Sequence, residues 1–215
     1  VELLPAVSCP AYRSLSDPIQ RRLENKGATI HVKAAVGKVG GGEACFQGKT
    51  GAAQPATVAL FLGATGRAAN LQGMGFEKLN LAMDKRHSQV NERAETSVPG
   101  VYAAGDVTGR WQLAHFASRQ GIVAINNMFG KPDICREEAI PAVIYTDPEV
   151  ASVGLTDTQA KERGLNPRVL KMPLGASGRF LAETEGERGF VKAILGERGE
   201  PLGMHVVGPY ASEMI

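Results

Sequence analysis

The stretch of this sequence best suited to chemistry lies near its middle, where one acidic residue follows a short apolar run. Val101 to Ala104 are small, β-branched or aromatic, and Gly105 and Asp106 come directly after them. A carboxylate at the end of a strand can accept hydrogen bonds from polyol hydroxyls. A helix that begins soon afterwards offers free N–H groups and the positive end of its dipole, which favour an anion. The pattern is typical of a site for a ligand with both hydroxyls and phosphates. The alternative is that Asp106 only caps a turn or the helix.

The elements that would position Asp106 can be predicted from the residues around it. Pro99-Gly100 is a turn signal, and Val101–Ala104 is predicted to be a short buried strand. After a small loop, apolar residues recur at helical spacing from about Trp111 to Met128, with Gln120 as a break in the pattern. The expected order is therefore strand, acidic turn and helix N-terminus.

The N-terminal part of the sequence predicts a β-α-β unit. Val1–Leu4 is apolar apart from one acid, and Asp17-Pro18 is a strong helix start. This helix is expected to run to Lys26 and to end at Gly27, and Ala28–Lys33 is expected to be the second strand. Such a unit belongs to nucleotide-binding sheets.

Two further strand patterns follow. Three consecutive glycines, residues 40 to 42, lie within Val36–Gly48 and predict a hairpin. Ala56–Leu62 is a fully apolar run, which predicts a strand that is buried on both faces. Gly66 follows this run, where a glycine lets the backbone approach a ligand.

The C-terminal part predicts a separate α+β module after a polar linker at Gly130–Glu138. Two short strands are expected within Ile140–Val153, around a turn at Thr146–Glu149. A helix is expected from Thr156 to Arg163, and an irregular loop over Gly175–Glu185. Three more strands are expected at Val169–Met172, Gly189–Leu195 and Pro201–Val207.

Composition excludes several classes of function. The net charge is +2 over 215 residues, and the basic residues form no stripe, so neither nucleic acid nor a membrane is expected as a partner. No apolar run approaches the roughly 18 residues of a membrane span. Three distant cysteines, Cys9, Cys45 and Cys135, and four histidines give no metal-ligand spacing, so no metal is expected. Asp84–His87 is expected to be a solvated charge run.

Several segments of the sequence resemble those of the flavin-dependent pyridine nucleotide-disulfide oxidoreductases. They include VYAAGDV with QLAHFASRQG, VELL with DPIQRRLENKG, GMGFEKLNL and IPAVIYTDPEVASVGLT. Leu113-Ala114-His115 and Tyr145-Thr146-Asp147-Pro148 are most similar to the dihydrolipoamide dehydrogenase branch. The resemblance implies an α/β fold, an incomplete Rossmann-like FAD/NAD-linked reductase domain, followed by an α+β dimerisation domain. The implied parts are residues 1–66 (second half of the NAD domain), 67–137 (return to the FAD domain) and 138–215 (dimerisation domain).

The resemblance also implies sites for two cofactors, FAD and NAD. Asp106 would bind the ribityl chain of FAD. The backbone around the helix start would line the flavin, at Gln112, Leu113, Ala114 and His115. For NAD, the implied residues are Glu2, Val36 and Gly66, and an acid at Glu2 favours NAD over NADP. From the residues alone, Glu2 is a surface charge and Val36 is a buried strand-end side chain.

The catalytic groups of that family are not found in this sequence. No C-x-x-x-x-C pair occurs, and the family's His-Glu pair follows the segment that ends here as GPYASEMI. No catalytic residue is therefore assigned, and His205 is not the family's catalytic His. Both ends look cut, so the sequence is interpreted as a piece of a longer protein, inactive by itself as a lipoamide dehydrogenase.

The resemblance finally implies the activity and partners of the parent protein. It would pass electrons from dihydrolipoyl groups to NAD, as a cytoplasmic homodimer. Its partner would be the lipoyl domain of a 2-oxoacid dehydrogenase or of the glycine cleavage system. The alternatives are a related reductase, similar to mercuric or glutathione reductase or to a soluble transhydrogenase, and a non-catalytic dimerisation module.

Overall fold

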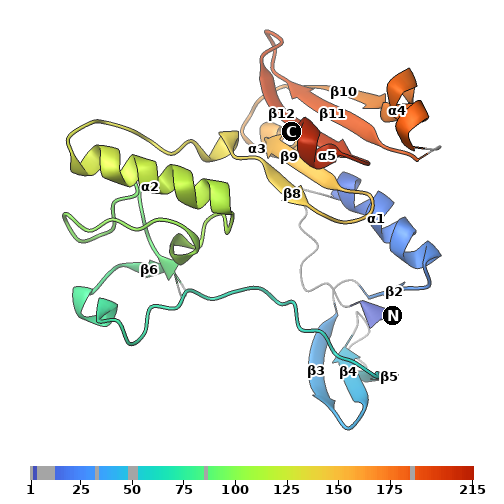
Figure 1. Cartoon of the computed structure of the whole chain (residues 1–215), viewed down its shortest axis with the longest axis horizontal. Coiled ribbons are helices and arrows are strands. Elements are labelled where there is room, and N and C mark those ends of the chain that lie inside the picture. Colours follow the sequence, from blue (N-terminus) through green and yellow to red (C-terminus); the bar gives the residue numbers. More distant parts are fainter. Residues whose placement is uncertain (1, 4–12, 32–33, 48–52, 85–86, 185–186) are drawn as a thin grey trace. The chain divides into compact units, whose positions relative to one another are not determined.

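The computed structural model describes residues 2–3, 13–31, 34–47, 53–84, 87–184 and 187–215. The chain divides into two compact units: Val1–Thr65 together with Pro141–Ile215, and Gly66–Ile140. It contains both helices and strands, which confirms the expected α/β class (Figure 1). None of the helices in the described ranges has the length and apolar character needed to cross a bilayer. The division into residues 1–66, 67–137 and 138–215 stays a prediction.

The first unit begins with the predicted β-α-β order. Strand β1 (Glu2–Leu3) pairs in parallel with β2 (Thr29–Ile30), and helix α1 (Arg13–Asn25) connects them. The predicted helix start at Asp17-Pro18 is wrong, because α1 begins four residues earlier and contains Pro18. Pro18 therefore lies inside the helix instead of at its first position, in spite of the hydrogen bond that an interior proline removes. Residues 32–33, the predicted end of the second strand, lie outside the described residues.

A three-stranded sheet follows. Strands β3 (Ala35–Gly40) and β4 (Glu43–Gln47) form the predicted hairpin, and its turn residues Gly41 and Gly42 have φ of 64° and 81°. These positive values are accessible to glycine without a steric penalty, which is why this triplet makes the turn. Strand β5 (Ala53–Thr57) pairs with β4.

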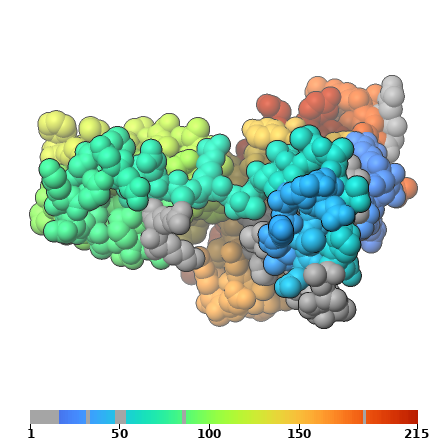
Figure 2. Space-filling view, turned by 90° about the horizontal axis from the view of Figure 1, so that it is seen from below, coloured from blue at the N-terminus to red at the C-terminus, as the bar shows by residue number. Residues whose placement is uncertain are grey.

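The expectation of a buried strand over Ala56–Leu62 is wrong. Strand β5 ends at Thr57, and the side chains of Leu60 and Leu62 are 88% and 84% exposed. A strand buried on both faces needs neighbouring strands and covering helices. Within the described residues no strand pairs with 58–65. The part of the chain around this run, coloured blue to cyan, is visible at the surface in Figure 2.

The C-terminal module is a five-stranded antiparallel sheet with the strand order β10-β11-β12-β9-β8 (Figure 1). Its strands are β8 (Ala142–Ile144), β9 (Val150–Gly154), β10 (Arg168–Pro173), β11 (Phe190–Leu195) and β12 (Pro201–Val207). All five coincide with predicted strands. Each strand has its partners within this part of the chain, so the apolar pattern and the pairing agree.

Helices pack on both faces of this sheet. Helix α3 (Asp157–Glu162) begins with a capping box between Thr156 and Gln159, as predicted, and its Ala160 packs with Ile194. On the same face Ile19 of α1 contacts the cluster of Val150 and Val207. Helix α5 (Ala211–Met214) contacts Ala151 and Val206, which alternate to the opposite face.

The expected irregular loop over Gly175–Glu185 is wrong in part. A 3₁₀ turn, η5 (Leu174–Ala176), and a short helix, α4 (Gly178–Thr184), occupy most of it. Two local hydrogen bonds stabilise α4. The Phe180 N–H donates to the Ser177 hydroxyl, and the Thr184 hydroxyl donates to the Phe180 carbonyl. The glycines and polar residues of this segment masked the helix in the sequence pattern.

The second unit is built around one long helix, α2 (Ala114–Met128), close to the predicted 111–128. The described part of the unit also contains the 3₁₀ turns η2 (Phe76–Leu79), η3 (Asp106–Thr108) and η4 (Glu137–Ala139), and the strand pair β6 (Met83–Asp84) and β7 (His87–Ser88). The apolar core joins Ala94, Val123 and Ala124 with Tyr102 and Cys135.

Two expectations about this unit are corrected. Val101–Ala104 is not a strand, because only Tyr102 is paired, in a single bridge with Glu95. One bridge gives no ladder to extend. Asp84–His87 is not uniformly solvated, since His87 is half-buried and its Nε2 atom is shielded from solvent, with no hydrogen-bond partner among the described residues. Residues 85–86 lie outside the described residues.

Candidate functional site

Asp106 lies at the start of η3, in a turn that requires glycine. Gly105 has φ 84° and ψ −155°, and a Cβ atom there would lie 3.3 Å from the Cβ of Ala117 on α2. A side chain at residue 105 would therefore be strained and crowded. The glycine is buried, whereas the Asp106 side chain is 48% exposed. The turn thus presents a carboxylate outward from a backbone packed against α2.

Arg67 is the charged partner of Asp106. Its Nη1 lies 3.7 Å from Asp106 Oδ2, and the Arg67 side chain is 79% exposed. Exposed ion pairs contribute only about 0–1 kcal/mol to stability. The Asp106 oxygens can therefore accept hydrogen bonds from a ligand's hydroxyls at little cost from losing this pair.

The N-terminus of α2 is open to an anion. Leu113 occupies the N-cap position with extended backbone, no side chain of the described residues caps the helix, and the first turn contains no acidic residue. Gln112, Ala114 and His115 are exposed, and Leu113 is half-buried. The first-turn N–H groups and the positive end of the helix dipole are thus available to a phosphate or another electron-rich group.

The polar residue that joins the Asp106 turn to α2 is Gln120. Its Oε1 atom accepts a hydrogen bond from the Gly105 N–H at 2.8 Å, and the residue is 2% exposed. In the sequence, Gln120 counts only as a break in the apolar stripe of the helix. The missed signal is its position: a polar residue on a face that is otherwise buried needs a hydrogen-bond partner.

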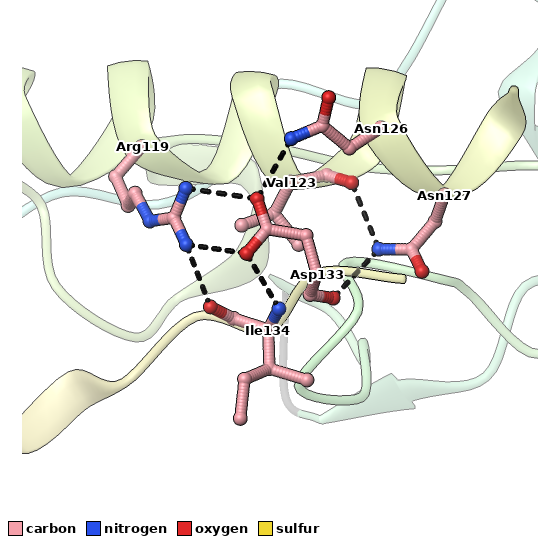
Figure 3. A network of polar contacts seen from close by, with 6 residues as sticks. All are labelled: Arg119, Val123, Asn126, Asn127, Asp133 and Ile134. Carbon is pink, nitrogen blue, oxygen red and sulfur yellow. Dashed lines mark hydrogen bonds and ion pairs between the residues drawn. The ribbon is translucent and has the colours of Figure 1, made fainter. Parts of the chain in front are cut away.

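A second polar network fixes the middle of α2 to the segment that follows the helix (Figure 3). Two nitrogens of Arg119 bind the two carboxylate oxygens of Asp133, at 2.9 Å and 2.6 Å. Asn126 donates to Asp133 Oδ2, and Asn127 donates to the carbonyl groups of Val123 and Asp133. The hydrogen bonds from Arg119, and then from Asn126, lower the pKa of Asp133 to about 2. This network links α2 to Asp133, whose side chain is less exposed than that of Asp106.

Of the residues predicted to contact NAD, Glu2 and Val36 belong to the first unit, and Gly66 belongs to the second unit together with Asp106. Glu2 belongs to β1, at the parallel pairing of Glu2 with Thr29, and its side chain lies outside the described residues. Val36 belongs to β3 and is 39% exposed, so the expectation that it is buried is wrong. Gly66 has φ 106°, and a Cβ atom built there would meet nothing within 4 Å. This open glycine is suited to close approach by a ligand.

The remaining reactive side chains form no alternative centre in the described part of the chain. Cys45 and Cys135 are free thiols, and burial raises the pKa of Cys135, which disfavours the reactive thiolate. Cys9 lies outside the described residues. His205 is 2% exposed and its Nε2 lies 3.1 Å from the Leu155 carbonyl oxygen. No group of three or more His, Cys, Asp or Glu is arranged there to hold a metal.

Comparison with known proteins assigns both parts of the chain. Residues 1–121 match the family described as pyridine nucleotide-disulphide oxidoreductase, and residues 140–215 match the dimerisation domain of the same family. A dihydrolipoyl dehydrogenase of Thermus scotoductus is 38% identical over the whole chain and 48% of its own length. One of Chlamydia muridarum is 43% identical over 70% of this chain and 32% of its own length.

A solved structure with the same fold is LpdA from Mycobacterium tuberculosis. It aligns with a TM-score of 0.83 and 25% identity over all of this chain and 48% of its own. The chain thus spans between about a third and about a half of the length of the relatives it matches.

Proposed function

Since this chain belongs to the pyridine nucleotide-disulphide oxidoreductases, we propose that its Asp106 turn and the start of α2 are one side of an FAD site. The family uses FAD and NAD(H). The observation that supports the proposal is the exposed Asp106 carboxylate beside Gly105, whose N–H is bound by Gln120 of a helix that no described side chain caps. Hydroxyl groups of a ligand can donate hydrogen bonds to the carboxylate, and an electron-rich ring edge or a phosphate can bind at the helix N-terminus.

The residues present fit this cofactor. Asp106 would accept hydrogen bonds from the ribityl hydroxyls, and the N–H groups around Gln112, Leu113, Ala114 and His115 would face the flavin. Because the backbone would make these contacts, they do not depend on the side chains, which are exposed at three of these four positions. When bound, FAD supplies two-electron redox chemistry. The role of this chain's residues is to bind and orient it.

We propose NAD as the second cofactor, with Glu2, Val36 and Gly66 as its contacts. The support is the parallel pairing of β1 and β2 around α1, the β-α-β order of dinucleotide-binding sheets. The open backbone at Gly66 is consistent with close approach.

We propose that the whole protein transfers electrons from dihydrolipoyl groups to NAD. The support is that curated relatives which match the full length of this chain are named dihydrolipoyl dehydrogenase. The partner would then be a lipoyl domain. The 215 residues contain no C-x-x-x-x-C pair, so this chain alone is expected not to turn over lipoamide. The match of residues 140–215 to a dimerisation domain supports a homodimer, which sedimentation equilibrium tests directly.

The experiment that tests the flavin site is titration of the purified chain with FAD, followed by absorbance and by quenching of flavin fluorescence. Saturable binding with a perturbed flavin spectrum is expected. Asp106→Asn should weaken it about tenfold, the equivalent of one charge-assisted hydrogen bond. Asp84→Asn is the matched control, because Asp84 is also an exposed acid of the same unit and should leave binding unchanged. Absence of saturable binding, or equal affinity of Asp106→Asn and the parent, would contradict the proposal.

A further inference from the structure

We propose that Gln120 is a positioning residue for the cofactor: it holds the Asp106 turn in register with the N-terminus of α2. The inference rests on the proposed FAD site. It adds a residue that contacts no part of the cofactor but determines where two of the cofactor's partners lie relative to each other.

The contacts of Gln120 span the whole turn. Its Oε1 accepts from the Gly105 N–H at 2.8 Å, and its Nε2 lies 3.5 Å from the hydroxyl oxygen of Thr108. That hydroxyl in turn donates to the Gly105 carbonyl at 2.8 Å. Gln120 and Thr108 are 2% and 6% exposed, so water does not compete for these hydrogen bonds. Asp106 lies between the two turn residues that Gln120 reaches.

A glutamine is energetically unfavourable at this buried position unless its amide group has hydrogen-bond partners. Gln120 lies on the face of α2 whose other buried members are Phe116, Val123 and Ala124. Burying an amide without partners is unfavourable by several kcal/mol, so an apolar residue would pack there more cheaply. An apolar residue would leave the buried Gly105 N–H unpaired. Only a neutral side chain with both an acceptor and a donor serves Gly105 and Thr108 together.

Gln120 therefore connects the Asp106 turn directly to α2, the two parts of the chain that are proposed to bind the cofactor. The Gly105 N–H belongs to the residue directly before Asp106, so its hydrogen bond fixes the direction in which the Asp106 carboxylate leaves the turn. The other end of the link is on the second turn of α2, which is rigid with respect to the helix N-terminus. Without Gln120 each feature persists, but their spacing is no longer set by a direct bond.

The test compares Gln120→Met with Val123→Ala in the full chain. Both change buried positions of α2, but only the first removes the hydrogen bonds to the turn, since Val123 packs in the cluster of Ala94 and Ala124. Two quantities are measured for each: the exchange rate of the Gly105 amide without FAD, and the affinity for FAD. Thermal unfolding shows how far each variant is destabilised.

Gln120→Met is expected to speed exchange of the Gly105 amide and to weaken FAD binding about tenfold, which corresponds to about 1.4 kcal/mol. Val123→Ala is expected to lower the unfolding temperature while leaving both quantities at the parent's values. If Gln120→Met does not fold, Gln120→Glu replaces it. Glu keeps an acceptor for Gly105, so Gly105 should stay protected and the affinity for FAD should stay close to the parent's; a loss of affinity with Gly105 still protected would overturn the inference.

The outcomes separate this inference from the proposed function. If the parent chain binds FAD and Gln120→Met binds it equally well, the inference is overturned and the site stands. If the two substitutions weaken binding in proportion to their loss of stability, Gln120 is structural only and the inference is again overturned. If the parent chain does not bind FAD, the proposed function fails, and the inference that rests on it is overturned with it.

Discussion

The five-stranded C-terminal sheet and the N-terminal segment of the same unit differ in how their apolar residues are used. In the sheet, strands β8 to β12 pair with one another, and Val150, Ala151, Ile194, Val206 and Val207 are each at most 2% exposed. In the N-terminal segment, the apolar run that includes Leu60 and Leu62 lies exposed beyond the end of β5. The difference teaches that an apolar run becomes a buried strand only where the same chain provides its neighbours.

Truncating one leucine-sized side chain in each region should give very different losses of stability. Ile194→Ala empties a position that is 0% exposed between Leu155, Ala160 and Leu202, and it should cost about 2–5 kcal/mol. Leu62→Ala removes a side chain that is 84% exposed, and it should change stability by less than about 0.5 kcal/mol. Urea unfolding, followed by far-UV circular dichroism, measures both.

The contrast between the two regions would be contradicted if Leu62→Ala lowered the free energy of unfolding as much as Ile194→Ala, because Leu62 would then be buried in solution. A second copy of the chain is one way to bury it. Repeating the Leu62→Ala measurement over a range of protein concentrations distinguishes this case, since stabilisation by association depends on concentration.

The same contrast explains which elements could be predicted from the sequence. The strands of the C-terminal sheet, the capping box at Thr156 and the glycine hairpin at Gly41-Gly42 follow from local rules of side-chain alternation, capping and turn chemistry. Val101–Ala104 has strand-like residues, yet only a single bridge forms, at Tyr102. Propensity alone could not show that a paired neighbour was missing.

The candidate site shows the corresponding limit for function. Asp106 and the start of α2 were recognisable, because the glycine before the acid and the helix start are local features. Gln120 was not, because its role depends on a turn fifteen residues earlier in the chain. The pairing of Arg119 with Asp133 was missed for the same reason. Side-chain hydrogen bonds between distant segments leave no periodic signal.

His205, in the core of the C-terminal sheet, should make the stability of the chain depend on pH. Burial, together with the positive charge of Lys192, lowers the pKa of His205 below its ordinary value, and its Nδ1 has no partner among the described residues. The unfolded chain therefore binds a proton near pH 6.5 that the folded chain does not. Stability is fully present above about pH 6.5 and is lost as the pH falls towards the folded pKa, with a slope of at most about 1.4 kcal/mol per pH unit.

His205→Gln should flatten this slope between about pH 6.5 and 5, as measured by unfolding at several pH values. Asp157→Asn is the control from the same cluster. The pKa of Asp157 is lowered by its bond with Lys192, so its contribution is present above about pH 4 and is lost only below that. An unchanged slope in His205→Gln would show that His205 is protonated, and hence solvated, in the folded chain.

The smallest expected effect concerns how the N-terminal segment is attached to the sheet. Asp147, in the turn between β8 and β9, accepts hydrogen bonds from Lys26 at 2.8 Å and from Arg22 at 3.1 Å and 3.2 Å. These bonds lower the pKa of Asp147, and all three side chains are about half exposed. Exposed pairs add little to global stability. Ile19 remains packed against Val150 and Val207 without them.

Asp147→Asn should therefore leave the unfolding temperature nearly unchanged, yet increase amide exchange in the last turns of α1. Lowering the pH from 6 to well below the ordinary carboxyl pKa of about 4 should have the same effect on α1 in the parent, because Asp147 is protonated only below its lowered pKa, and should have no further effect in the variant. Equal exchange in parent and variant would mean that the apolar contact of Ile19 alone attaches α1 to the sheet. In that case the two regions differ in apolar burial only, and the ionic contacts add nothing to the attachment.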